Sequence, residues 1–298
     1  MKLGIILNPA AGRGAALKKL PDLEKHLKGR GVSYELHLTE RPGHARELAY
    51  QLAKRDDVFS VVAAGGDGTV NEVGWGLLHK NKPLFVIPFG TGNDYSKAVH
   101  DEDRDWKKVI DNVLKTRKIK FVDVCMVEEE HQTRPVFNGF GMGFDAHVAS
   151  IIRKIPLLKG DLLYIVGVIK SFFSFTPPHL TIRTGKKILS EQFHICSVGC
   201  GQFMGGGFHL FPHASLTDGL IDIDLIRKVK TSVFLKKMWL VLKGTHLNEP
   251  EVIYFQTPDD VHIVSDRPVY YHLDGEVSPQ PVREVKIKIL KKALPVLI

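Results

Sequence analysis

Three glycine-rich turns, each directly after a short apolar run, constrain the fold of this chain most. The runs "LGIIL", "VFSVVAA" and "PLFVIPF" are followed by "NPAAGRG", "GGDGT" and "FGTGND". Segments with apolar residues at helical spacing, such as residues 15–28 and 44–55, lie between them. This alternation predicts a mostly parallel sheet covered by helices on both faces. We therefore expect all three turns at the carboxyl edge of one sheet, where ligands bind in such folds.

The pattern changes near residue 121, where short alternating segments begin, among them "HLTIRTG", "DVHIVS" and "EVKIKIL". Such segments, bounded by Gly, Pro and Asp, predict an antiparallel β-sandwich. Two helical segments, near residues 158–173 and 232–242, interrupt it. We expect an α/β nucleotide-binding domain over residues 1–120 and a β-sandwich domain over 121–284. The tail, 285–298, can pack back on the first domain.

Length and charge fit this division but select no ligand. A chain of 298 residues usually exceeds one core, and its net charge of +8 suits nucleic acid, an anionic membrane or phosphorylated substrates equally. Three cysteines without a C-x-x-C pair suggest a reducing compartment. The first apolar run is too short for a signal peptide, and none approaches the roughly 18 residues of a membrane span. We expect a cytoplasmic protein that contacts a membrane only at its surface, without spanning it.

The second turn has the composition of a phosphate-binding loop. Gly65, Gly66 and Gly68 permit close approach of backbone N–H groups, and the helix start adds partial positive charge. Thr69 can cap that helix or bond a phosphate. The alternative is a tight turn that needs glycine for its backbone angles alone, and the presence of three such turns favours phosphate binding.

Asp67 indicates a metal at this turn. A carboxylate beside phosphates is repulsive unless a cation lies between them, and magnesium binds through one or two carboxylates, waters and phosphate oxygens. Asp94 of "FGTGND" can contribute from the neighbouring turn. Asp67 therefore suits a magnesium nucleotide better than a dinucleotide pyrophosphate.

Other phosphate-binding signatures fit less well. The chain has no G-x-x-x-x-G-K-[ST] motif and no H-R-D or D-F-G motif. "GRGAAL" opens like a dinucleotide-binding loop, with Glu35 at a suitable distance, but Leu17 replaces the third glycine. Dinucleotide binding is the weaker alternative.

The motifs together resemble a known family. "NPAAG" (8–12), "GGDGTVNEV" (65–73), "PFGTGND" (88–94), "FNGFGMGFDAHV" (137–148) and "HLDGEV" (272–277) are similar to the diacylglycerol kinase and bacterial lipid kinase family. Sphingosine kinases and NAD kinases are more distant relatives, and "GGDGT" alone is shared with NAD kinases. The similarity covers nearly the whole chain.

The resemblance implies a phosphofructokinase-like nucleotide-binding domain, a C-terminal β-sandwich and an active site in the cleft between them. It also implies ATP as donor and Glu276 as catalytic base. Asp67, singled out above by its suitability for a metal, is the second candidate catalytic residue. The residues assigned to ATP and its magnesium are Asn8, Pro9, Ala10, Ala11, Gly12, Thr39, Gly65, Gly66, Asp67, Gly68, Thr69, Val70, Asn71, Thr91 and Asp94.

Two turns of the second half have assignments that ordinary turn chemistry also explains. By resemblance, "SLTDGL" matches a structural magnesium site with the Asp218 carboxylate and the carbonyls of Ser215 and Leu220 as ligands; the alternative is a hairpin turn. Asp274 and Glu276 of "LDGE" lie at a strand end, where a simple β-turn is the alternative to catalysis. A carboxylate there suits deprotonation of an attacking hydroxyl.

A lipid acceptor needs an apolar surface. The segment 162–175 is apolar and rich in phenylalanine, which fits a core helix or a lipid groove, and the glycine-rich loop 204–211 fits a mobile lip or an ordinary loop. The tail "REVKIKILKK" alternates Lys with Ile, which suits either an edge strand or contact with anionic lipid.

These observations favour an ATP- and Mg²⁺-dependent kinase of diacylglycerol or a similar membrane alcohol, such as phosphatidylglycerol or a sphingoid base. An NAD kinase and a non-catalytic nucleotide-binding protein are the alternatives. We expect a membrane lipid substrate, peripheral contact with an anionic membrane surface and no nucleic-acid partner; a homodimer is compatible with the sequence.

Overall fold

The computed structural model describes residues 2–100, 105–130, 132–152 and 175–298, in two compact units. The first comprises residues up to Val124 together with Leu290–Ile298, and the second comprises Cys125–Ile289. Strands β5 (Ile119–Glu128) and β15 (Val282–Leu297) contribute to both units. The helix expected near residues 158–173 and most of the apolar segment 162–175 lie outside the described residues.

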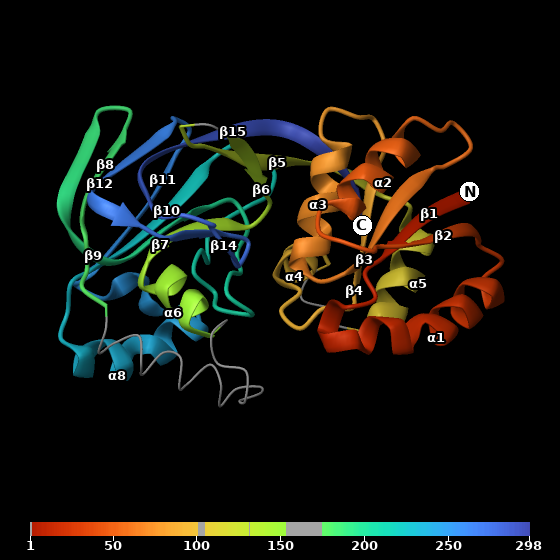
Figure 1. Cartoon of the computed structure of the whole chain (residues 1–298), viewed down its shortest axis with the longest axis horizontal. Coiled ribbons are helices and arrows are strands. Elements are labelled where there is room, and N and C mark those ends of the chain that lie inside the picture. The colour runs from red at the N-terminus through yellow and green to blue at the C-terminus, as the bar shows by residue number, and fades with distance from the viewer. Residues whose placement is uncertain (1, 101–104, 131, 153–174) are drawn as a thin grey trace. The chain divides into compact units, whose positions relative to one another are not determined.

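The N-terminal unit is built on a parallel sheet in the order β2-β1-β3-β4, with the end of β15 beside β4 (Figure 1). Alternation along β1 explains why helices cover both faces. Leu3, Ile5 and Leu7 belong to the core under α1 and α5, whereas a Cβ on Gly4 would meet Leu52 of α2 at 2.9 Å. The strands are β1 (Lys2–Leu7), β2 (Ser33–Leu38), β3 (Ser60–Gly65) and β4 (Leu84–Pro88).

The helices of this unit follow the strands in alternation, as the spacing of apolar residues predicts. Two of these helices were not expected from the sequence: α4, which is only 6 residues long, and the longer α5. Helix α5 begins after Asp105, whose carboxylate accepts a hydrogen bond from the Lys107 backbone N–H at 3.0 Å. The bounds are η1 (Ala11–Gly14), α1 (Ala15–Gly29), α2 (His44–Ala53), α3 (Asp67–Leu77), α4 (Asp94–Val99) and α5 (Trp106–Thr116).

The C-terminal residues complete the N-terminal unit. Val296 pairs in parallel with Leu84 of β4. The Ile298 backbone N–H donates to the Lys118 carbonyl at 2.8 Å, and the Lys292 N–H donates to the Asp123 carboxylate at 2.7 Å. Residues 290–298 of the expected tail therefore belong to this unit, whereas residues 285–287 pair with β12 (Val261–Val269) in the other unit.

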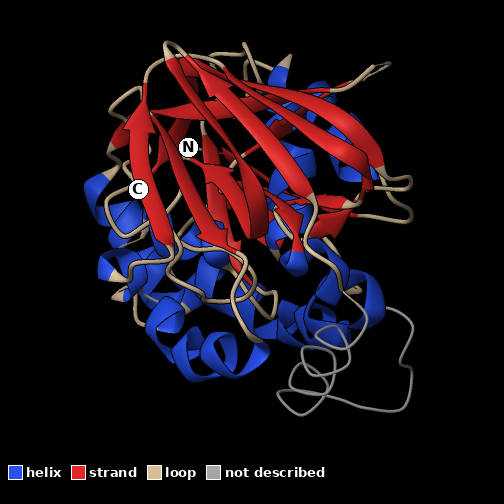
Figure 2. Ribbon diagram, turned by 90° about the vertical axis from the view of Figure 1, so that its left-hand side faces the viewer, coloured by secondary structure: helices blue, strands red, loops and turns tan. Residues whose placement is uncertain are grey.

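The C-terminal unit is an antiparallel sandwich, and Figure 2 shows its strands from the side of this unit. Strand β9 belongs to both of its sheets. The first half of β9 pairs with β8, and its second half lies between β7 and β10. The strands are β5 (Ile119–Glu128), β6 (Thr133–Val136), β7 (Gly139–Gly143), β8 (His179–Thr184), β9 (Lys187–Gly199), β10 (Ile221–Arg227), β11 (Val252–Thr257), β12 (Val261–Val269), β13 (Tyr271–Leu273) and β14 (Glu276–Val277).

Helices α6 (Phe144–Ile152) and α8 (Thr231–Leu242) and the short η2 (His246–Asn248) complete this unit. Phe144 of α6 and Phe234 of α8 meet edge to face, with ring centroids 5.0 Å apart, in a second apolar cluster. Helix α8 matches the helix expected over 232–242. Among the described residues, no helix is long and apolar enough to cross a bilayer.

Candidate active site

Side chains and backbone tie the first glycine turn to the second. The Asn8 carboxamide oxygen accepts from the Ala10 N–H at 3.0 Å, and its nitrogen donates to the Thr69 hydroxyl at 3.2 Å. Thr69 is 5% exposed, and its hydroxyl joins the two turns through this bond. The N-cap of α3 is Gly66, and no side chain caps the helix there. Gly12 is required for two reasons: its φ is +58°, and a Cβ would lie 2.7 Å from the Phe89 carbonyl oxygen.

The second and third turns approach so closely that only glycine fits. A Cβ on Gly90 would lie 2.3 Å from the Gly66 Cα, and a Cβ on Gly65 would lie 2.3 Å from the Thr69 hydroxyl. The Phe89 and Gly90 N–H groups both donate to the Gly65 carbonyl, at 2.9 and 3.0 Å. The sequence therefore brings these turns together at the carboxyl ends of β3 and β4, as expected.

Asp67, the first residue of α3, reaches across to the third turn. Its carboxylate accepts a hydrogen bond from the Tyr95 backbone N–H at 3.0 Å. The first turn of a helix leaves N–H groups without intrahelical partners and carries partial positive charge. The negative charge of Asp67 is therefore favourable at this helix start. Its hydrogen bond to the Tyr95 N–H also fixes the position of α4 relative to α3.

Asp94 has a different environment from Asp67. Its carboxylate pairs with the Lys97 ammonium at 2.9 Å, and both side chains are buried, 7% and 5% exposed. Asn93, in a left-handed conformation, closes the turn by bonding both the N–H and the carbonyl of Gly90 at 2.9 Å. These contacts give Asp94 a structural role in the turn, whereas its predicted contact with a magnesium nucleotide is untested.

The remaining predicted nucleotide residues lie in the same three turns or, for Val70 and Asn71, in the first turns of α3; Thr39 is the exception. Thr39 follows β2, and its N–H donates to the Leu7 carbonyl at 3.0 Å. Val70 is buried, whereas Thr91 is exposed and Asn71 partly so. The positions of Pro9, Ala11 and Gly68 within these turns suit backbone contacts to phosphate.

Glu72, at the end of the "GGDGTVNE" motif, has a role that sequence reasoning missed. Its carboxylate accepts from the N–H groups of Gly43 and Ala45, at 2.8 and 3.0 Å. It thereby caps the start of α2 from the neighbouring helix α3. An acidic residue in the first turns of a helix gives no sequence signal for such a distant partner.

In the C-terminal unit, Asp274 organises the strand end that carries Glu276. Its carboxylate accepts three backbone N–H bonds, from Phe137 (3.0 Å), Asn138 (2.8 Å) and Gly139 (3.0 Å). Asp274 and Gly275 have positive φ values of 48° and 87°, as a two-residue hairpin turn requires. The turn is thus a β-turn, and Asp274 is a positioning residue within it.

Glu276 is the first residue of β14, paired with Leu273 across the hairpin. Its side chain is exposed. An exposed carboxylate on a rigid two-residue hairpin can reach a substrate hydroxyl without a large desolvation cost. The geometry therefore fits a general base.

A partly buried polar cluster supports the other end of β13. The Tyr271 hydroxyl bonds both the Glu129 carboxylate and the Arg134 guanidinium, and Glu129 pairs with Arg134 at 3.0 Å. Burial raises the pKa of Tyr271, so the hydroxyl stays protonated. Because β13 leads directly into Asp274, this cluster fixes the strand that presents Glu276.

The turn with Ser215, Asp218 and Leu220 precedes β10. The Asp218 carboxylate accepts from the Leu220 N–H at 3.0 Å, and Gly219 has a φ of +72°. The turn follows a long connection from β9 and is not a hairpin. No group of three His, Cys, Asp or Glu side chains gathers as a metal site among the described residues; a site built partly from carbonyls remains a prediction.

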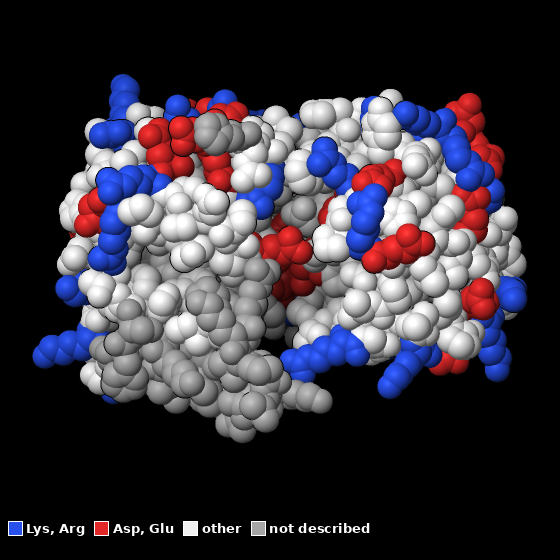
Figure 3. Space-filling model, in the orientation of Figure 1, with Lys and Arg blue, Asp and Glu red and all other residues white. Residues whose placement is uncertain are grey.

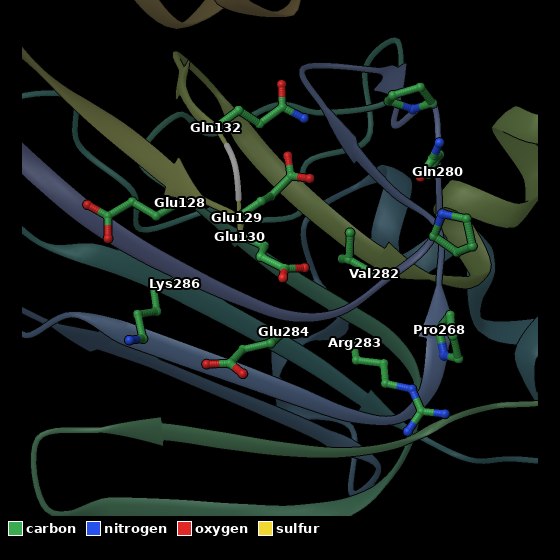
Figure 4. A pocket seen from close by; sticks show the side chains of 12 residues that line it. Glu128, Glu129, Glu130, Gln132, Pro268, Gln280, Val282, Arg283, Glu284 and Lys286 are labelled. Atoms are coloured by element: carbon green, nitrogen blue, oxygen red, sulfur yellow. The ribbon is translucent and has the colours of Figure 1, made fainter.

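Figure 4 shows a pocket of about 910 Å³ in this unit that does not include Asp274 or Glu276. Glu129 and Glu130 line it from the β5–β6 turn, and Arg283 and Glu284 line it from β15. Its four glutamates, which include Glu128, disfavour a phosphate. We therefore assign no part of phosphoryl transfer to this pocket.

A parallel α/β unit with three convergent glycine turns, and a sandwich with a carboxylate hairpin, define a kinase-like phosphotransferase. The family described as "Diacylglycerol kinase catalytic domain" matches residues 2–127. The family described as "YegS C-terminal NAD kinase beta sandwich-like domain" matches residues 139–298.

Curated relatives and solved structures agree. The chain is 28% identical over 274 residues to a diacylglycerol kinase of Bacillus subtilis (strain 168), covering 91% of this chain and 88% of the relative. It is 26% identical over 278 residues to a diacylglycerol kinase of Staphylococcus carnosus (strain TM300), covering 93% and 89%. The crystal structure of a diacylglycerol kinase from Bacillus anthracis str. Sterne has the same fold, with a TM-score of 0.70 at 20% identity over 99% of this chain and 96% of that one.

The chain belongs to the diacylglycerol kinase family of lipid kinases. It is a phosphotransferase with the two-part fold of that family, an α/β unit with a parallel sheet and an antiparallel β-sandwich.

Proposed function

We propose that this protein transfers the γ-phosphoryl group of ATP to the hydroxyl of diacylglycerol or a similar membrane alcohol, with Mg²⁺. The observation that carries the proposal is the joined second and third turns, where the Asp67 carboxylate bonds the Tyr95 N–H. Turns that place backbone N–H groups and one carboxylate at a helix start suit a nucleotide triphosphate. The two curated relatives described above are named diacylglycerol kinase.

The residues at this turn fit magnesium. Mg²⁺ prefers oxygen ligands and usually keeps several waters, so one or two carboxylates plus phosphate oxygens suffice. Asp67 is the carboxylate that would hold it, because Asp94 is paired with Lys97. When bound, the ion neutralises charge on the phosphates.

The chain's own residues divide the remaining work. The backbone of the first and second turns binds phosphate oxygens, and Asn8 holds these turns together through Thr69. Glu276 accepts the proton of the acceptor hydroxyl, since phosphoryl transfer needs positioning, charge neutralisation and a base. Asp274 holds the hairpin that carries Glu276.

The test is transfer of label from γ-labelled Mg-ATP into a pool of diacylglycerol, phosphatidylglycerol, sphingosine and NAD. Label in the organic phase supports a lipid kinase, and chromatography names the acceptor. Label on NAD would instead support a soluble NAD kinase. The absence of label from both phases, with all substrates present and the protein folded, would contradict the proposed reaction.

We further propose that the protein works as a peripheral enzyme at an anionic membrane surface. Its net charge of +8 supports such an association. The structural magnesium site at Ser215, Asp218 and Leu220 also stays a proposal, which metal analysis of the purified protein and of an Asp218→Ala variant would test.

A further inference from the structure

Helix α8 in the C-terminal unit has two opposite faces of different chemistry. Phe234 and Val241 are buried and belong to an apolar cluster, where Phe234 meets Phe144 at 5.0 Å between ring centroids. Positions separated by three and four residues share one face of a helix. By that spacing, Ser232, Lys236, Trp239 and Lys243 form a single stripe opposite the buried face, and all four are exposed.

Trp239 is the centre of this stripe, with 61% of its surface exposed. The Lys243 ammonium lies 5.3 Å from the centre of its ring. A lone exposed apolar side chain is ordinary. A tryptophan between two lysines on an outward helix face is instead the pairing found at the headgroup level of membranes, where the ring is amphipathic and long cationic side chains reach the phosphates.

The sequence that carries this stripe has charges of one sign. Residues 227–243 contain six basic and no acidic residues. Two of the six are neutralised, Arg227 by Glu191 at 2.8 Å and Lys237 by Glu249 and Glu251 at 2.5 and 2.6 Å. The other four form no ion pair with any described residue, although Lys228 donates to the Gln192 side-chain carbonyl at 3.2 Å; the four are Lys228, Lys230, Lys236 and Lys243. Lys and Arg side chains project from the lower outer edge of this unit, where α8 runs (Figure 3).

We propose that the exposed stripe of α8, with Trp239 at its centre and Lys236 and Lys243 beside it, docks the protein on an anionic lipid bilayer. The choice of a bilayer rests on the proposed function, since a kinase of a membrane alcohol must meet its acceptor at the lipid surface. Charge complementarity selects anionic lipid, because each lysine near such a surface contributes roughly fivefold to the binding constant. The tryptophan adds an interfacial anchor that salt does not screen.

The binding test uses the purified full chain with phosphatidylcholine vesicles that either contain or lack phosphatidylglycerol. We expect binding to the anionic vesicles and little binding to the neutral ones. The Lys236→Glu/Lys243→Glu variant should lower the partition coefficient at least about tenfold, and Trp239→Ala should lower it several-fold even in high salt.

The N-terminal unit offers a matched control. Tyr50 is exposed on α2 with Lys54 and Lys80 over its ring, at 4.0 and 5.2 Å from the centre. Lys54→Glu/Lys80→Glu makes the same change in net charge beside an exposed aromatic ring. We expect this variant to retain most of its binding, because the α8 stripe is intact.

Fluorescence locates the contact directly. Brominated phospholipid in anionic vesicles should quench the wild-type protein, and the quenching should be largely lost in Trp239→Phe, although Trp75 and Trp106 remain. Equal quenching of both proteins would overturn the proposal, as would equal loss of binding in the control and α8 variants. A shift from dimer to monomer in the α8 variants, with unchanged vesicle binding, would assign the stripe to a second copy of this chain and would also overturn it.

Activity separates this inference from the proposed function. With diacylglycerol dispersed in neutral detergent micelles, the α8 lysine variant should match the wild type, and on anionic vesicles it should be slower. A wild-type protein that binds vesicles through Trp239 but phosphorylates no lipid would contradict the proposed function and leave the docking surface standing.

Discussion

The carboxylate of Asp67 accepts a hydrogen bond from the backbone N–H of Tyr95 at 3.0 Å. This bond joins the first residue of α3 to the second residue of α4 and thereby fixes two of the glycine turns together. The same carboxylate is the proposed ligand of magnesium. Its charge and its hydrogen-bonding capacity are therefore separable by mutation.

We predict that Asp67→Asn and Asp67→Ala differ in stability but not in activity. Asparagine keeps an oxygen that accepts from the Tyr95 N–H, whereas alanine leaves that N–H without a partner, at a cost of about 1 kcal/mol. Both remove the charge, so transfer should fall by at least about a hundredfold. Thermal unfolding and rates of label transfer would check this. Near-normal turnover in either variant would remove Asp67 from catalysis.

Glu276 should matter for activity and hardly at all for stability. Its side chain is exposed, so Glu276→Gln should change the free energy of unfolding by no more than about 0.5 kcal/mol. Loss of the base should lower the turnover number about 10²–10⁴-fold. A variant that keeps wild-type turnover would show that another group accepts the proton.

Asp274, in contrast to Glu276, should contribute strongly to stability. Asp274→Ala leaves the N–H groups of Phe137, Asn138 and Gly139 without their acceptor, which should destabilise the protein by about 2–4 kcal/mol. Asp274→Asn should be milder, because asparagine tolerates the positive φ and keeps an acceptor. Urea unfolding would measure both. If the two variants were equally and weakly destabilised, the three hydrogen bonds would not hold the hairpin.

The contact between Gly90 and Gly66 predicts a large effect from one methyl group. Gly90→Ala would place a Cβ 2.3 Å from the Gly66 Cα, so the two turns must separate. We expect a loss of stability of about 2 kcal/mol and a raised KM for ATP. Gly29→Ala is the control: its Cβ would meet nothing within 4 Å, and the change at the end of α1 should be neutral or slightly stabilising. Equal effects at both positions would contradict the steric argument.

The sequence predicted most of the N-terminal unit because its signals are local. A glycine after a strand, an amphipathic period and the resemblance to the family all placed the three turns at one sheet edge. Helix α5 was not predicted, although its signal is local too: Val109, Ile110 and Val113 have helical spacing after the cap at Asp105.

The unpredicted parts depend on distant partners. Asp274 bonds residues 135 to 137 positions away in the chain, and Asp67 bonds an N–H 28 positions away. Neither a turn motif nor a periodicity carries such information. Strand β7 could not be predicted from its sequence for a related reason. A Cβ on Gly139 would meet the Met204 sulfur at 2.9 Å. Tertiary packing therefore places glycine in a strand position where β-branched residues are usual.

The buried pair of Asp94 and Lys97 provides a test of what Asp94 does. Lys97→Met should destabilise the protein by about 3–5 kcal/mol, because it leaves a buried carboxylate without its cation. Adding Asp94→Asn should recover much of that loss. If the double variant is stable and transfers phosphate normally, Asp94 serves the fold; if it is stable but raises the KM for ATP strongly, Asp94 also contacts the nucleotide.

His194 should make the stability of the C-terminal unit fall in mild acid. Its Nδ1 accepts from the Val229 N–H at 3.1 Å, its ring packs against Phe234 of α8, and burial lowers its pKa below the usual 6.5. The unfolded chain therefore binds a proton below pH 6.5 that the folded chain resists. This contribution is complete above pH 6.5 and is lost as the pH falls through the folded pKa. His194→Gln should flatten the dependence of the free energy of unfolding on pH below 6.5, which urea titrations at successive pH values would measure. An unchanged slope would mean that the histidine titrates alike in both states.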